Sequence, residues 1–180
     1  MKKTALLGLL VSGLIAADEG WYVGADAYKT RADITVSNGV ATEKQNFTRY
    51  AQTAKVGYYF DNNSRINAFY QHYNSSQNST GHAYGFNYDY LIGESALKPF
   101  IGGMVGYSKY LQSDVGLDIK LNGTFIGADV GLNYAFGENI SLEGGYRYIW
   151  SNAHGTFADS TSEAKVDTMK NWFVGANYKF

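Results

Sequence analysis

Eight segments of the sequence alternate between apolar side chains and small or polar ones with a period of two residues. This is the repeat of a β-strand, because successive side chains of a strand point to opposite faces of the sheet. The segments span residues 21–30, 50–60, 65–73, 82–92, 100–111, 124–136, 140–150 and 171–180. Each is about ten residues long, which is the length that a tilted strand needs to cross a bilayer.

The connections between these segments alternate in length. Three are short, and four are longer and polar: the short ones cover residues 61–64, 93–98 and 137–139, and the long ones cover 31–48, 74–81, 112–122 and 151–168. Short turns on one side and long loops on the other are typical of transmembrane barrels. The predicted fold class is therefore all-β, an eight-stranded antiparallel up-and-down transmembrane β-barrel. An even number of strands places both ends of the mature chain on the short-turn side.

The two faces of the strands distinguish a membrane barrel from a soluble one. One face carries rings and aliphatic side chains, and the other carries Gly, Asn and nearly all charged residues of the strands. A soluble β-sandwich or lipocalin-like barrel would enclose those charges and expose the rings to water. We expect the reverse, with small residues and paired charges filling a narrow lumen. The predicted lumen charges are Asp26, Lys55, Arg65, Asp89, Asp129, Glu143, Arg147 and Lys179.

Aromatic residues make up 16% of the chain and cluster towards the strand ends. Such rings form girdles where a barrel crosses the two membrane interfaces. On the short-turn side they are Trp21, Tyr58, Phe60, Tyr90, Phe136, Tyr178 and Phe180, and on the long-loop side they are Tyr107, Trp150 and Trp172.

The first 17 residues predict a secretory signal peptide. Lys2 and Lys3 are followed by an apolar run, residues 5–15, that is too short to span a bilayer as a helix. We expect cleavage after Ala17 or one residue earlier, which leaves residues 18–180 as one barrel domain. The mature chain then has 13 basic and 16 acidic residues, which offers no basic surface for nucleic acid. It contains no cysteine, which suits a Gram-negative envelope and rules out thiolate chemistry.

The sequence resembles the small eight-stranded outer-membrane barrels, a group typified by the transmembrane domain of outer-membrane protein A and its opacity-protein relatives. The resemblance covers the whole mature chain. The motifs that carry it are W-Y-V-G-A-D-A (21–27), K-P-F-I-G-G-M-V-G-Y (98–107), L-E-G-G-Y-R-Y (142–148) and the terminal N-Y-K-F. No peptidoglycan-binding domain follows these motifs, so wall anchoring is not expected.

The resemblance implies a location and partners. The barrel is expected in a bacterial outer membrane, surrounded by outer-membrane lipid and lipopolysaccharide, with periplasmic termini and extracellular long loops. The last strand of the family serves as a signal for the barrel-assembly machinery. The residues that match this signal are Trp172, Val174, Ala176, Tyr178 and Phe180.

Three candidate sites were weighed on the residues. Glu143 and Arg147 match a charge network inside the family's barrels, and the lumen charges could form either structural ion pairs or the gate of a narrow pore. His72 and His82 flank the second long loop, where strand pairing could bring them together. His154 lies in the fourth loop. The expected arrangement of all three histidines is a surface or girdle position without a metal.

The remaining candidate is a nucleophilic site. Outer-membrane lipid A deacylases carry a His and a Ser two residues apart on a lipid-facing strand. Here Asn74 takes the place of that Ser relative to His72, and Ser75 falls on the opposite face unless a bulge intervenes.

The function predicted from these features is that of a non-enzymatic, monomeric outer-membrane barrel without a cofactor. Its role would be structural, in membrane integrity, with adhesion to a host or surface ligand through the long loops. Two alternatives remain open at this point: a narrow porin-like channel for ions or small solutes, and a lipid A-modifying enzyme.

Overall fold

The computed structural model describes residues 19–37, 42–73, 79–114, 117–156 and 163–180. These residues form nine β-strands: β1 (Gly20–Ser37), β2 (Thr42–Tyr59), β3 (Ser64–Tyr73), β4 (Ser79–Leu91), β5 (Leu97–Asp114), β6 (Leu117–Phe136), β7 (Ile140–Ser151), β8 (His154–Thr156) and β9 (Glu163–Lys179). None of the described residues belongs to a helix that is long and apolar enough to cross a membrane.

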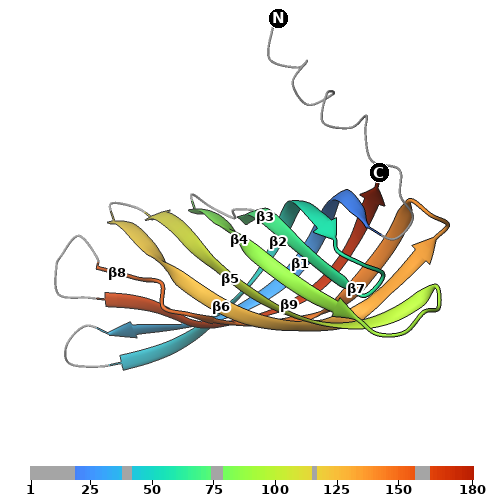
Figure 1. The fold of residues 1–180 in the computed structure, drawn as a ribbon. Helices are drawn as coiled ribbons and strands as arrows, with labels where there is room; N and C mark the ends of the chain where they lie inside the picture. Colours follow the sequence, from blue (N-terminus) through green and yellow to red (C-terminus); the bar gives the residue numbers. More distant parts are fainter. Residues whose placement is uncertain (1–18, 38–41, 74–78, 115–116, 157–162) are drawn as a thin grey trace, which may run out of the picture.

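The eight long strands form a closed antiparallel barrel (Figure 1). Each strand pairs with the next, and β9 closes the sheet by pairing with both β7 and β1, so that Ala176 lies opposite Leu142 on one side and Ala25 on the other. The short β8 pairs with β9 and meets β6 at one position. The predicted all-β, up-and-down architecture is therefore confirmed, with β8 as an additional short strand.

The two ends of the barrel differ. Short turns connect β2 to β3, β4 to β5 and β6 to β7 at the short-turn end, where the first residues of β1 also pair with the last residues of β9. The opposite, long-hairpin end, where β8 and the far ends of β1, β2, β5 and β6 lie, is at the left of Figure 1. Gly93 and Gly137 in the short turns have positive φ values of 97° and 72°, a conformation that glycine adopts without strain.

The predicted lengths of the loops at the long-hairpin end were wrong. Residues 31–48 are mostly strand, since β1 and β2 stay paired up to Ser37 opposite Thr42. The pairing of β5 with β6 likewise continues to Asp114 opposite Leu117. In these segments the apolar alternation changes phase: Ala32, Ile34 and Val36 of β1 and Leu121 of β6 face inward, and the polar residues between them face outward. The outward apolar pattern of the membrane-facing strand therefore stops before the strand does, while the neighbouring strand still supplies the backbone partners. Much of residues 151–168 is also strand, in β8 and β9.

The faces of the strands were predicted correctly. Outward-facing apolar side chains are exposed around the middle of the barrel, with Val130 at 53% and Val174 at 66% exposure. Aromatic pairs border this apolar belt, among them Trp21 with Tyr58 at the short-turn end and Tyr146 with Trp172 towards the long-hairpin end. An apolar belt between two rings of aromatic side chains matches the outer surface of a barrel in lipid.

Side chains fill the interior of the barrel. Four phenylalanines, Phe69, Phe100, Phe125 and Phe173, are buried there, and Met169 and Val166 lie nearer the long-hairpin end. The register of β9 against β1 shifts between Asp33 and Ile34, so that Asp33 faces Thr168 and Ile34 faces Val166. This bulge keeps both Met169 and Val166 in the interior although they are three residues apart.

Candidate functional site

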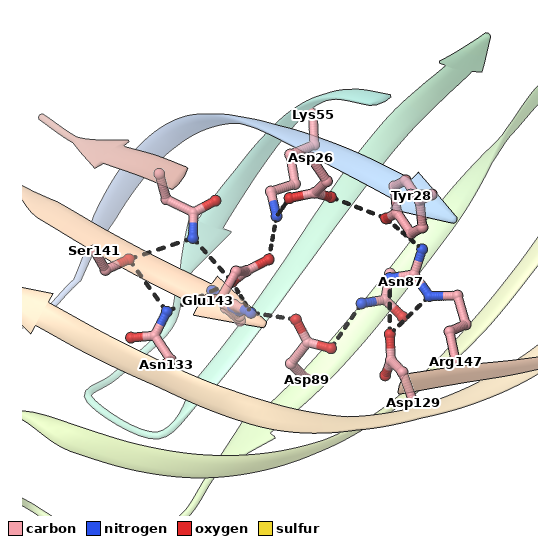
Figure 2. Close-up of polar contacts among 12 residues, drawn as sticks. Asp26, Tyr28, Lys55, Asn87, Asp89, Asp129, Asn133, Ser141, Glu143 and Arg147 are labelled. Atoms are coloured by element: carbon pink, nitrogen blue, oxygen red, sulfur yellow. Dashed lines mark hydrogen bonds and ion pairs between the residues drawn. The ribbon is translucent and has the colours of Figure 1, made fainter. Parts of the chain in front are cut away.

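Seven of the eight charged side chains predicted for the lumen, all but Lys179, meet in the middle of the barrel. Alternation along the strands turns them inward, and these seven come from six different strands. Seven of the eight are joined by ion pairs and hydrogen bonds, together with Tyr28, into one set (Figure 2). We call this set the lumen network; it comprises Asp26, Tyr28, Lys55, Arg65, Asp89, Asp129, Glu143 and Arg147.

Glu143 on β7 is the centre of the lumen network. Its carboxylate accepts hydrogen bonds from Lys55 Nζ, from Arg65 Nη2 at 2.8 Å and from Asn177 Nδ2 at 2.9 Å. The residue is only 7% exposed. One buried carboxylate therefore holds two cations from neighbouring strands β2 and β3.

Each of those two cations has a second carboxylate partner. Lys55 Nζ donates to Asp26 Oδ1 at 2.7 Å, and Arg65 Nε donates to Asp89 Oδ2 at 2.8 Å. Charge-assisted hydrogen bonds of this kind satisfy groups that would be costly to bury alone.

A second cluster surrounds Arg147 on β7. Its guanidinium donates to Asp129 Oδ2 at 2.8 and 3.0 Å and to the hydroxyl of Tyr28 at 2.7 Å. That hydroxyl in turn donates to Asp26 Oδ2 at 2.9 Å, which links the two clusters. The guanidinium carbon also lies 5.2 Å from the ring centroid of Phe173, within the range of a cation–π interaction.

Sequence reasoning missed the role of Tyr28. Its position on β1, two residues after Asp26, puts it on the same inward face, and its hydroxyl bridges Asp26 and Arg147. Asn87 was likewise missed and donates to Asp89 Oδ1 at 2.6 Å. Both residues stand two positions from a lumen carboxylate on the same strand, and this spacing is the signal that could have identified them.

Glycines in the wall make room for the carboxylates. A Cβ atom built on Gly102 of β5 would overlap the carboxylates of Asp89 and Asp129, and one built on Gly175 of β9 would overlap that of Asp26. These inward glycines let the charged side chains reach across a narrow lumen.

Lys179 lies apart from the lumen network. It faces the interior at the short-turn end, where its Nζ lies 5.8 Å from the ring centroid of Tyr59. Within the described part of the chain it forms no ion pair with the other predicted charges.

The lumen network lies between two cavities of the interior. The cavity among its side chains is small: the volume that the centre of a water molecule can occupy is about 10 Å³. A wide vestibule of about 710 Å³ opens at the short-turn end, lined by Asn133, Ser141 and Lys179 among others. An apolar pocket of about 80 Å³, lined in part by Thr30 and Met169, lies towards the long-hairpin end.

The other candidate sites are distributed over the surface. His72 and His82 lie next to each other on the outer wall, whereas His154 contacts the backbone oxygen of Asn152 at 2.8 Å. Among the described residues, no group of three or more His, Cys, Asp or Glu side chains could hold a metal ion. Asn74 and Ser75, the positions considered for a nucleophile, lie outside the described residues.

Comparisons with known proteins agree with this geometry. A family model described as "Outer membrane protein beta-barrel domain" matches residues 4–180. An uncharacterized protein of Haemophilus influenzae is 25% identical over 170 residues, covering 82% of this chain and 89% of the relative.

Solved structures share the fold. The crystal structure of Neisserial surface protein A superposes with a TM-score of 0.66 and 22% identity, covering 89% of this chain and 97% of the other. OprG from Pseudomonas aeruginosa gives a TM-score of 0.62 and 13% identity, covering 92% and 98% of the two chains. The N-terminal β-barrel domain of OprF from the same organism gives 0.62 and 14%, covering 88% and 97%.

Proposed function

Because this chain belongs to the outer membrane protein β-barrel family, we propose that it is a non-enzymatic structural protein of the outer membrane, whose lumen is closed by the lumen network. The observation that carries the proposal is the free space of about 10 Å³ among the network's side chains. This is close to the least that a single water molecule needs, and a hydrated ion brings several waters.

The electrostatics of the lumen network also support closure. Three cations face four carboxylates in it, and each cation has a carboxylate partner within 3.0 Å. A passing ion would have to displace side chains that are hydrogen-bonded to one another and enclosed by rings. Removing one partner of a buried pair costs several kcal/mol, roughly 3–5, so spontaneous opening of the network would be rare.

The long hairpins form the second part of the proposal. We place them outside the cell and the two chain ends in the periplasm, with a monomeric barrel embedded in outer-membrane lipid and lipopolysaccharide. The tip of the β1–β2 hairpin carries exposed polar side chains at Thr42, Glu43, Lys44 and Gln45. Loops and hairpins on a rigid scaffold are common sites of recognition, which supports contact of this end with a host or surface ligand.

Planar-bilayer recording tests the closed lumen. The wild-type protein should give no discrete conductance steps over a range of voltages. The double variant Arg65→Ser/Glu143→Ser removes one cation and one anion from the lumen network, and it should conduct because water can replace the lost side chains.

The matched control removes an ion pair outside the lumen. Lys170 Nζ lies 3.0 Å from Asp33 Oδ2 on the outer wall, and the Asp33→Ser/Lys170→Ser variant should remain silent. Steps from the wild-type protein would overturn the proposal in favour of a narrow channel for ions or small solutes.

The non-enzymatic part of the proposal has its own test. Lipid A from cells with and without the protein should have the same acylation pattern. A lost or added acyl chain that depends on the protein would establish a lipid-modifying activity instead.

A further inference from the structure

Two histidines oppose each other on the outer wall of the barrel. His72 on β3 and His82 on β4 are direct partners in the strand register, two residues beyond the pair formed by Tyr70 and Tyr84. Both imidazoles are half-buried and face outward from the barrel, as Tyr70 does. They therefore lie at the border of the aromatic girdle, on the side of the long hairpins.

The polar atoms of this pair converge on one point. The Nδ1 atoms of His72 and His82 lie 3.4 Å apart, and the hydroxyl oxygen of Tyr70 lies 2.5 Å from Nδ1 of His82. The rings of Tyr70 and His82 are stacked, with centroids 5.7 Å apart. An imidazole nitrogen either donates one proton or accepts at one lone pair. Nδ1 of His82 therefore cannot satisfy both neighbours at once.

A metal ion bound by both Nδ1 atoms would remove the competition of Tyr70 and His72 for Nδ1 of His82. The distance between the two Nδ1 atoms fits such an ion. Imidazole nitrogens bind Zn²⁺ at about 2.0–2.1 Å, and two such nitrogens at a tetrahedral angle lie roughly 3.3–3.4 Å apart. We propose that Nδ1 of His72 and Nδ1 of His82 bind one divalent transition-metal ion of the class that prefers imidazole, which includes Zn²⁺, Ni²⁺ and Cu²⁺.

The neighbours define the rest of the site. In the proposed site, a metal bound at Nδ1 of His82 takes the place of the hydrogen bond from the hydroxyl of Tyr70, and the hydroxyl then hydrogen-bonds a metal-bound water instead. Gln52 on β2 is the register partner of His72, and Lys109 on β5 is the register partner of His82. The Nζ of Lys109 lies 5.9 Å from the ring centroid of Tyr107, so its charge is drawn to that ring. Two protein ligands leave open coordination positions, which water fills.

The binding test uses the mature protein, without a polyhistidine tag, folded in non-ionic detergent micelles. Titration with Zn²⁺ in a calorimeter should show one saturable site per chain. The His72→Asn and His82→Asn variants should each lose this binding, because one imidazole does not form a chelate. Tyr70→Phe should weaken the affinity about tenfold, the low end of what outer-shell partners contribute.

His154 provides the matched control, since the chain has 3 histidines and no cysteine. The His154→Asn variant should bind Zn²⁺ as the wild type does. Equal Zn²⁺ binding by wild type, His72→Asn and His82→Asn would overturn the proposal, as would loss of binding in His154→Asn alone.

A second measurement needs no variant. In ¹⁵N spectra of the wild-type imidazoles, Zn²⁺ should shift the Nδ1 signals of two histidines and leave the third unchanged. Shifts of all three signals together, or of none, would contradict a site formed by the pair.

Discussion

Glu143 is the residue on which the lumen network depends most. Its carboxylate is shared by Lys55 and Arg65, and Asn177 adds a third donor. Without Glu143, Lys55 would keep only Asp26 and Arg65 only Asp89, so each buried cation would lose one of its two carboxylate partners.

Glu143→Ala should therefore lower the free energy of unfolding by about 3–5 kcal/mol, because it leaves two buried cations without their shared partner. Glu143→Gln should cost less, since the amide oxygen still accepts a hydrogen bond. Urea unfolding from lipid vesicles measures both values. A cost below that of the control variant described next would refute the central position of Glu143.

Asp33→Ala is the control, since it breaks an ion pair on the outer wall beyond the aromatic girdle. The hydrogen bond from Lys170 holds the pKa of Asp33 below its ordinary value of 3.8. A lowered pKa stabilises the folded state above the ordinary pKa, and this contribution is lost as the pH falls through the lowered value. The difference in stability between Asp33→Ala and wild type should therefore vanish in strong acid.

A pair of adjacent glycines tests how tightly the carboxylates fit. Gly102→Ala would push a methyl group into the carboxylates of Asp89 and Asp129, while the nearest atom to a new Cβ at Gly103 is 3.9 Å away. Overpacking of this kind costs about 1–3 kcal/mol, so Gly102→Ala should lower the unfolding midpoint in urea. Gly103→Ala should leave the midpoint unchanged or raise it slightly. Equal midpoints for the two variants would mean that the lumen is looser than described.

For single residues, the sequence predicted which charges face the lumen better than it predicted which residues they contact. The place of each charged residue in the two-residue alternation of its strand was enough to assign it to the lumen. The partners depend on how the strands close around the lumen, so Arg147 and Tyr28, which are 119 residues apart, could not be matched from the sequence.

Along each long strand, the pattern of apolar residues differs between the part inside the apolar belt and the part in the long hairpin. Within the apolar belt, every second residue faces outward, and the alternation is strong. Beyond the belt, β1 and β2 stay paired, but the outward residues become polar and the inward residues of β1, Ala32, Ile34 and Val36, are apolar. Strand number and face were therefore predictable within the belt, whereas strand ends at the long-hairpin end were not, because the apolar residues move from the outward to the inward face before the strand ends.

The depth of β6 residues in the membrane can be tested by placing an arginine at two outward positions of the strand. Val130 lies in the middle of the apolar belt, and Phe136 ends the strand at the short-turn end. Val130→Arg should cost roughly 2–4 kcal/mol, and Phe136→Arg only about 0–1 kcal/mol, because the cost of a charge on the lipid face falls towards the interface. Folding into phosphatidylcholine vesicles, followed by urea titration, measures both. Equal costs would be inconsistent with a membrane centred on Val130.

The last strand combines a structural role with the proposed assembly signal. Phe180 donates its backbone N–H to the oxygen of Trp21 at 3.0 Å, and its ring contacts Tyr178. Phe180→Ala removes only the ring, so refolded protein should lose no more than about 1.5 kcal/mol of stability. The amount of protein in the outer membrane of living cells should fall much further if the ring is read by the assembly machinery. If the outer membrane contained as much Phe180→Ala protein as wild type, the ring of Phe180 would not be part of an assembly signal.

The whole molecule is a barrel with rings and aliphatic side chains outside and a charged centre inside, which we propose to be closed. The same alternation produces both surfaces, since each strand sends one residue outward and the next inward. The signal peptide at residues 1–17 stays a prediction, because these residues lie outside the described part of the chain.

Thiol labelling in oriented proteoliposomes tests this central claim most directly, since the chain contains no cysteine of its own. Three variants carry one cysteine each: Ser141→Cys in the vestibule at the short-turn end, Thr30→Cys in the pocket towards the long-hairpin end, and Val130→Cys on the outer wall. A small charged thiol reagent applied at the short-turn side should modify Ser141→Cys and leave the other two unmodified. Modification of Thr30→Cys from that side would mean that the lumen is open, and modification of Val130→Cys would mean that the outer wall faces water rather than lipid.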